Sequence, residues 1–168
     1  MFRKIIFSIG IVACTLLLSA QEAKNITGKK WYPYGNKKCV LIDKRTNEIF
    51  CKNDNPKFQT GAWQIIYLTE KTPVKLEISA ESKSAKIPQN LKTDSKYSIW
   101  ADLTFTDGTK KYGRIIPFSK NNHDWEKKTL ILNEKKVIKQ INIHLLFNQT
   151  PGEAIFRNFK VLQFSAGN

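Results

Sequence analysis

The sequence contains little of what enzyme and metal sites are usually built from. Its 168 residues include only 2 His, 3 Cys, and 14 Asp and Glu together. Neither histidine stands at zinc-ligand spacing from a cysteine or from the other histidine. A nucleophile elbow, a metalloprotease histidine pair and a Gly-rich phosphate loop are also missing. These absences predict a protein that is not an enzyme and needs no cofactor.

Arginine is scarce in a chain that is otherwise strongly basic. Of 28 Lys and Arg residues only four are arginine, and the formal net charge is +14. A lysine ammonium attracts anions but lacks the planar fork that reads phosphate or guanine. We therefore expect an anionic partner, such as an acidic polysaccharide or a negatively charged cell envelope, and no nucleic acid.

Long apolar runs are confined to the amino terminus. Residues 1–4 end in two basic residues, residues 5–18 are mostly apolar, and residues 19–20 are small. This is the layout of a secretory signal peptide over residues 1–20, and the apolar run is too short for a membrane span. We therefore expect a secreted or periplasmic protein. Loss of the segment removes two basic residues and no acid, so the net charge falls only from +14 to +12.

Cys14 leaves an alternative open. Ile11–Cys14 resembles the lipobox of bacterial lipoproteins, whose cysteine carries the lipid. Thr15–Leu18, which would follow the lipid directly, is mostly apolar where a polar tether is usual. Cleavage after Ala20 is the main expectation, and a lipoprotein anchored through Cys14 is the alternative.

The other two cysteines, Cys39 and Cys51, flank a stretch with the pattern of a hairpin. Two apolar runs are separated there by the turn-like residues 44–47. In an exported protein, an even pair of cysteines at this spacing favours a disulfide over a metal site or a nucleophile. We predict that Cys39 and Cys51 form a disulfide that staples this hairpin within an amino-terminal extension of residues 21–59.

The sequence from residue 60 to residue 168 predicts only strands. Apolar residues from Val74 to Ala80 fall at every second position, which is typical of a strand with one buried face. Similar short runs cover residues 61–68, 97–105, 114–118, 129–132, 137–147 and 154–164. No segment shows a capped helical period. We predict an all-β fold over residues 60–168, an antiparallel β-sandwich of the jelly-roll type.

Within this predicted sandwich, a series of short motifs has a characteristic order and spacing. The motifs are Gly61–Gln64, Ser82–Ala85, Phe105–Thr109, Phe118–Trp125, Lys136–Lys139 and Leu145–Phe147. From about Gly61 to Gln163 the sequence resembles the galactose-binding-like jelly-roll modules that accompany bacterial polysaccharide-degrading enzymes. The resemblance implies a noncatalytic carbohydrate-binding module with a β-sandwich fold.

The sequence departs from this family near its end. Such modules usually carry Phe-Asp-Asp in the last strand, whereas this chain has Phe156, Arg157 and Asn158. In related jelly rolls, an acidic residue at that place often helps to hold a structural calcium ion. Arg157 and Asn158 therefore put a calcium site in doubt.

A candidate binding face follows from the expected register. Alternation puts Trp100 and Asp102 on the side of their strand away from the core, and Asn142 and His144 on the corresponding side of a later strand. A tryptophan among polar neighbours is a flat platform for a sugar ring, whose hydroxyls bind the polar groups nearby. If these strands share one sheet, the carbohydrate site consists of Trp100, Asp102, Arg114, Asn142 and His144.

Other aromatic residues have two interpretations. Trp31–Tyr34 cannot all point inward from one strand, so they either line a ligand site or seal the edge of the sandwich. Trp63 is expected to pack in the core or in a turn. For Trp100, the alternative to an exposed platform is burial beneath residues 24–56.

The leading hypothesis is a secreted, noncatalytic protein similar to a carbohydrate-binding module, with acidic glycans as candidate ligands. The alternative is an envelope or extracellular scaffold that uses the sandwich to bind another protein. A glycan site requires Trp100 and His144 on one exposed face. A buried Trp100 together with a different exposed apolar patch would favour the protein partner.

Overall fold

The protein is described by a computed structural model that covers residues 22–88, 90 and 96–164. The predicted signal peptide of residues 1–20, with Cys14 inside it, lies outside the described residues. In the described part of the chain, no helix has the length and apolar character needed to cross a bilayer.

The described residues form eleven strands and one short 3₁₀ turn, η1 (Lys37–Cys39). The strands are β1 (Ala23–Asn25), β2 (Tyr32–Gly35), β3 (Val40–Ile42), β4 (Ile49–Asn53), β5 (Gln59–Tyr67), β6 (Lys75–Ala85), β7 (Lys96–Phe105), β8 (Lys110–Pro117), β9 (His123–Asn133), β10 (Ile138–Asn148) and β11 (Gly152–Phe164). Strands β5 to β11 correspond to the runs predicted from the sequence. The prediction of an all-β fold is therefore confirmed.

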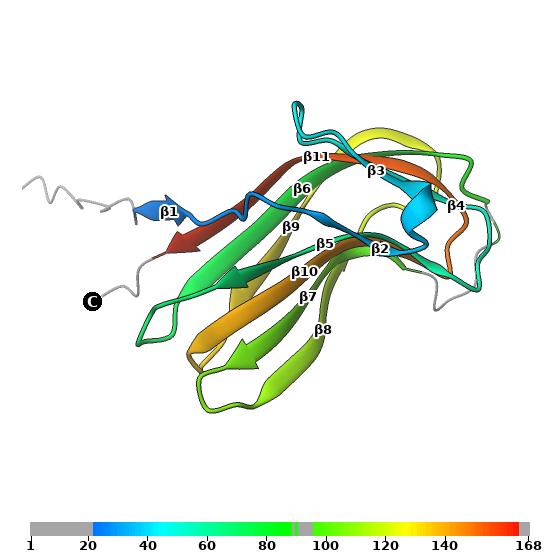
Figure 1. The fold of residues 1–168 in the computed structure, drawn as a ribbon. Coiled ribbons are helices and arrows are strands. Elements are labelled where there is room, and N and C mark those ends of the chain that lie inside the picture. The colour runs from blue at the N-terminus through cyan, green and yellow to red at the C-terminus, as the bar shows by residue number, and fades with distance from the viewer. Residues whose placement is uncertain (1–21, 89, 91–95, 165–168) are drawn as a thin grey trace, which may run out of the picture.

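Two antiparallel sheets pack face to face as a β-sandwich (Figure 1). The six-stranded sheet has the order β3-β4-β11-β6-β9, and β1 also pairs with β11. The five-stranded sheet has the order β2-β5-β10-β7-β8. The stretch expected as an amino-terminal extension, residues 21–59, adds strands to both sheets: β2 lies at the edge of the five-stranded sheet, and the β3–β4 hairpin lies at the edge of the other.

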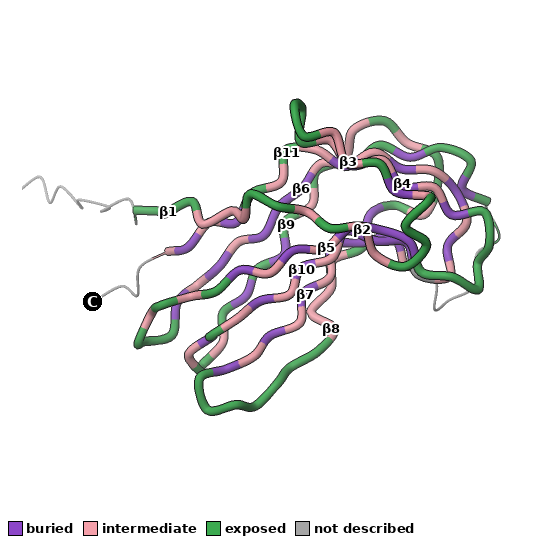
Figure 2. The backbone as a smooth tube through the Cα atoms, viewed as in Figure 1, coloured by how far each residue is buried: buried purple, intermediate pink, exposed green. Residues whose placement is uncertain are grey.

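Alternation along the strands places the core between the two sheets. In β7, Tyr97, Ile99 and Leu103 are buried, whereas Trp100 and Asp102 are partly exposed. The inward residues of β10 are Ile141, Ile143, Leu145 and Phe147. Figure 2 shows the same alternation along the central strands. Each large apolar side chain that is fully buried contributes about 1.5–3 kcal/mol, so a slip of one residue in register is strongly disfavoured.

An aromatic cluster packs around Tyr97 in the core. The Tyr97 ring centroid lies 4.8 Å from that of Phe147 and 5.0 Å from that of Phe118. The Tyr97 hydroxyl is hydrogen-bonded to the Ser82 hydroxyl, and burial raises the pKa of Tyr97. The buried phenol is therefore neutral and has its polar atom satisfied.

The predicted disulfide between Cys39 and Cys51 is wrong, because both residues are free thiols in the structure. The hairpin itself is present as β3 and β4, but its register pairs Val40 with Cys51. Val40 and Cys51 both point into the core. Cys39 is the residue before Val40, so its side chain does not lie on the core face. Cys39 Sγ instead accepts a hydrogen bond of 3.1 Å from Asn36 Nδ2.

Serine substitutions distinguish the two thiols from a disulfide. Cys39→Ser should change the free energy of unfolding by less than about 1 kcal/mol, because this residue lies outside the core. Cys51→Ser should cost about 1–3 kcal/mol, because it places a hydroxyl in fully buried apolar surroundings. Urea denaturation measures both values. A stapling disulfide would make the two substitutions equally destabilising, by about 2–5 kcal/mol.

Candidate functional site

One row of residues crosses the outer face of the five-stranded sheet. Its members, in the order of the strands, are Tyr32 on β2, Trp63 on β5, His144 on β10, Trp100 on β7 and Ile115 on β8. Each is the direct register partner of the next, and register partners project from the same face. On the three central strands, the residues before and after the row point into the core. The row therefore faces away from the core.

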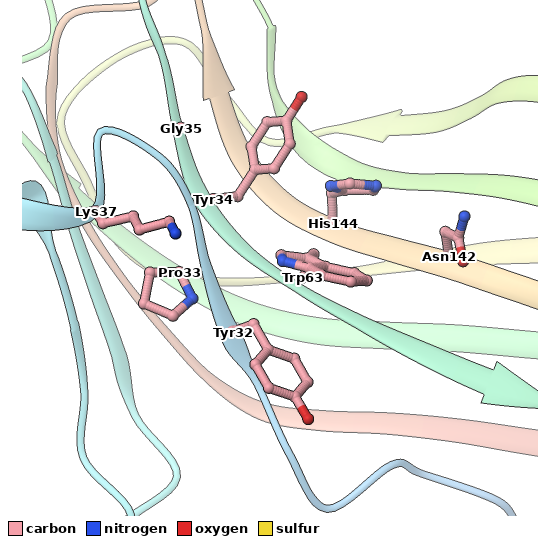
Figure 3. Close-up of a pocket in the computed structure, with 8 residues that line it drawn as sticks. All are labelled: Tyr32, Pro33, Tyr34, Gly35, Lys37, Trp63, Asn142 and His144. Atoms are coloured by element: carbon pink, nitrogen blue, oxygen red, sulfur yellow. The ribbon is translucent and has the colours of Figure 1, made fainter.

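Aromatic rings pack against one another at the β2 end of this row (Figure 3). Trp63 and His144 are stacked, with ring centroids 6.4 Å apart and an interplanar angle of 21°. Tyr32 lies 5.5 Å from Trp63, and Tyr34 meets the His144 ring edge-on at 5.0 Å. The Tyr34 hydroxyl donates a 2.7 Å hydrogen bond to Gln59 Oε1, which holds this ring in place.

Two adjoining hollows lie along this face, and Tyr34 and His144 line both of them. The larger has a volume of about 510 Å³, and its other lining residues are Tyr32, Pro33, Gly35, Lys37, Trp63 and Asn142. The smaller has a volume of about 140 Å³, and its other lining residues are Gln59, Trp100, Asp102 and Leu146. We call the two hollows together the sheet groove.

A glycine in β5 allows this strand and β10 to approach each other closely beside the smaller hollow. In the register, Gly61 stands between Tyr34 on β2 and Leu146 on β10. A Cβ atom at Gly61 would lie 2.2 Å from the carbonyl oxygen of Leu145, so a larger residue requires a shift of the backbone. The absent side chain thus lets β10 pack closely against β5 beside Tyr34 and Leu146, which both line this hollow.

Trp100 is held in place on two sides. Its Nε1 donates a 2.7 Å hydrogen bond to Asp102 Oδ1, and the backbone N–H of Gly113 donates to the same oxygen at 2.8 Å. Gly113 has a φ of +70°, and a Cβ atom there would lie 3.5 Å from the Trp100 ring. Trp100 is partly exposed, so it is not buried beneath residues 24–56. Of that stretch, only Tyr34 lines the hollow beside it.

His144 is neutral in the middle of the groove. Burial lowers its pKa, and the Asp102 carboxylate opposes this shift with a smaller effect. At pH 7 one nitrogen of the neutral imidazole donates and the other accepts. Nδ1 of His144 is buried and has no hydrogen-bond partner among the described residues. Nε2 is therefore the ring nitrogen left to meet a ligand.

Four of the five predicted site residues share this face. Trp100, Asp102, Asn142 and His144 all line the sheet groove. They come together because β7 and β10 are adjacent strands in which Trp100 is the register partner of His144 and Asp102 that of Asn142. The predicted site requires that these two strands belong to one sheet, and in the structure they do.

Arg114 does not belong to the groove, which corrects the prediction. Its register partner on β7 is Ala101, a fully buried residue. The Arg114 side chain therefore leaves the backbone on the inward face of the edge strand β8. Its Nε lies 3.6 Å from Oε1 of Glu134, just beyond β9. A register shift between Ala101 and Leu103 displaces β8 relative to a simple alternation, and Gly113, whose φ is +70°, is the sequence sign of this bulge.

Trp63 lines the groove, although from the sequence it is expected in the core or in a turn. Alternation along β5 gave the opposite signal, because Trp63, Ile65 and Tyr67 form the more apolar set of this strand, whereas the set that is buried includes Gln64. The aromatic run before β3 is divided between two sides of the sheet. Trp31 packs edge-on against Phe159 at 4.8 Å, whereas Tyr34 lines the groove.

The last strand carries an ion pair at the place where the resemblance implied a calcium ligand. Arg157 Nε lies 2.9 Å from Glu81 Oε2, and the Arg157 guanidinium lies 3.5 Å from the centroid of the Trp125 ring. Hydrogen bonds from Asn158 and Arg157, together with the smaller effect of the Arg157 charge, lower the pKa of Glu81. Within the described residues, no group of three or more His, Cys, Asp or Glu side chains is placed to hold a metal ion.

The lowered pKa of His144 predicts a pH-dependent stability. Between pH 7 and about pH 5.5, the unfolded chain takes up a proton at this residue that the folded chain resists, so the free energy of unfolding should fall as the pH is lowered. In His144→Asn this decrease should be smaller. Urea denaturation at several pH values measures the slope, and an identical slope in the variant would contradict the expectation.

Comparison with known proteins identifies the fold. No protein-family model matches the sequence, and no curated protein matches it. The CBM22-1 xylan-binding domain from Paenibacillus barcinonensis matches with a TM-score of 0.54 and 10% identity, over 87% of this chain and 95% of that one. A CBM4 structure matches with a TM-score of 0.51 and 12% identity, over 83% and 94%. The chain thus has the β-sandwich fold of these carbohydrate-binding modules.

Proposed function

We propose that the chain binds carbohydrate in the sheet groove and does not transform it. The observation that carries this proposal is the alignment of Trp63, His144 and Trp100 on three adjacent strands of one open face. Two strand spacings, about 10 Å, separate the backbones that carry the two tryptophans. The indoles are thus placed to contact different sugar units of one glycan chain.

The groove supplies both kinds of contact that a sugar requires. Its aromatic rings offer flat apolar surfaces to the C–H face of a pyranose. For the hydroxyl groups there are polar atoms nearby. Asn142 Oδ1 accepts a 2.8 Å hydrogen bond from Gln140 Nε2, so the Asn142 amide nitrogen is the donor left for a ligand. Asp102 uses Oδ1 for Trp100 and Gly113, so Oδ2 is its acceptor toward a ligand.

The single carboxylate of the groove supports binding over catalysis. All residues that line the sheet groove are described, and Asp102 is the only acid among them. Glycoside hydrolysis in most families uses two carboxyl groups about 5–10 Å apart across the scissile bond. One carboxylate, already held by two donors, does not provide that pair.

The proposal extends to the location and to the ligand class. Residues 1–20 have the layout of an export signal, which favours a secreted or periplasmic protein. The excess of 28 Lys and Arg over 14 Asp and Glu favours acidic glycans or an anionic envelope as the surroundings. One protein of the same fold is described as xylan-binding, which supports a polysaccharide as the ligand class.

Replacing a tryptophan platform should weaken glycan binding. Trp63→Ala and Trp100→Ala should each lower the affinity about tenfold or more, because each removes a large apolar contact with the sugar ring. A glycan array identifies ligands of the wild-type protein, and isothermal titration calorimetry then measures the affinities of the variants.

Tyr112→Ala is the matched control, since Tyr112 is an aromatic residue on β8 that is 67% exposed and lies outside the sheet groove. It should bind like the wild type, and urea denaturation should show that all three variants are folded. The proposal is overturned if the wild type binds no glycan on the array. It is also overturned if the control loses as much affinity as the groove variants.

A further inference from the structure

The sheet groove carries charges of opposite sign toward its two ends. Lys37 of η1 lines the larger hollow, and Asp102 of β7 lines the smaller one. Tyr34 and His144 lie between them as the residues that both hollows share. Because the imidazole of His144 is neutral at pH 7, Lys37 and Asp102 are the charged side chains of the groove. The groove is therefore electrically polarised.

Lys37 has no acidic partner among the described residues. Seven lysines of the described chain form ion pairs, as Lys52 does with Asp54 at 3.1 Å and Lys111 with Glu134 at 2.9 Å, and Lys37 is among the lysines that do not. No ion pair of the described chain includes Lys37. Figure 3 shows its side chain extending toward the strand that carries Pro33. An ammonium without a counter-ion thus stands beside the aromatic end of the groove.

A second lysine without an ion pair among the described residues reinforces this positive end. Lys57 and the exposed Phe58 line a further hollow of about 620 Å³, which shares Tyr34 and Gly35 with the larger hollow of the groove. The two lysines therefore line neighbouring hollows that meet at Tyr34 and Gly35, at the end of β2. At the other end, the Asp102 carboxylate repels anions, so an anionic ligand group is favoured only on the β2 side.

We propose that the Lys37 end of the sheet groove is a subsite for an anionic substituent of a glycan, a carboxylate or a sulfate. This inference rests on the proposed function. An ammonium donates a charge-assisted hydrogen bond to an oxygen of either group and does not select between them. The subsite sets the direction of the bound chain: the anionic unit lies near Lys37 and Tyr34, and an uncharged unit lies over Trp100 beside Asp102.

Paired probes that differ only in charge test this subsite. Tetragalacturonate and its fully methyl-esterified form test the carboxylate, and a sulfated carrageenan tetrasaccharide and its desulfated form test the sulfate. Lys37→Gln should weaken binding of the acidic member of a pair about 3- to 10-fold at low ionic strength and leave the neutral member unchanged. Since Lys37 is exposed, the difference should shrink in high salt.

Lys38→Gln is the matched control. It removes the same charge from the same turn, and Lys38 does not line the sheet groove. All four affinities should stay within about twofold of the wild-type values. Equal losses in the two variants would assign the effect to overall charge and overturn the subsite, as would tighter or equal binding of the neutral probes by the wild type.

The subsite and the proposed function fail in different ways. If Trp63→Ala weakens binding of a neutral glycan while Lys37→Gln leaves the acidic probes unaffected, the groove binds carbohydrate and the subsite is overturned. If the wild-type protein binds neither the probes nor any glycan on an array, the proposed function is overturned and the subsite with it.

Discussion

The register of β10 with its two neighbours is the constraint on which the rest of the structure depends. Ile143 and Leu145 point into the core from this central strand, and their burial fixes which residues face outward. His144 stands between them and is the register partner of both Trp63 and Trp100. The free energy that stabilises the core therefore also positions the outer row, because a slip of one residue would bury the row and expose the core.

The stretch before β5 turns a flat sheet face into a groove. The three central strands alone present Trp63, His144 and Trp100 on an open surface, with no side chain standing beside them to enclose a ligand. Pairing of β2 with β5 adds Tyr34 beside His144, and η1 then places Lys37 at the same end. This part of the chain is thus integral to the site, although it lies outside the region in which the sequence resembles known modules.

The sequence predicted which face a residue occupies where alternation along a long strand is regular, and it failed where the pattern is mixed, as around Trp63 and Gln64, or where pairing between strands decides the outcome. Trp100 and His144 were placed correctly because their strands have ten and eleven residues of consistent pattern. The disulfide at Cys39 failed because a hairpin pattern does not fix which residues are opposite each other. Arg114 failed because of a bulge. The role of Tyr34 could not be read from a four-residue strand that contains a proline.

The fixed position of Trp100 has a thermodynamic consequence. A ring held by a hydrogen bond at its edge and by the backbone of Gly113 near its face has few alternative rotamers to lose when a ligand arrives. The long, exposed side chain of Lys37 must be ordered on binding, which costs about 0.5–1.5 kcal/mol. The two ends of the groove would then differ in the entropy of association. The tryptophan end is pre-organised, whereas in the proposed complex the lysine end would become ordered on binding.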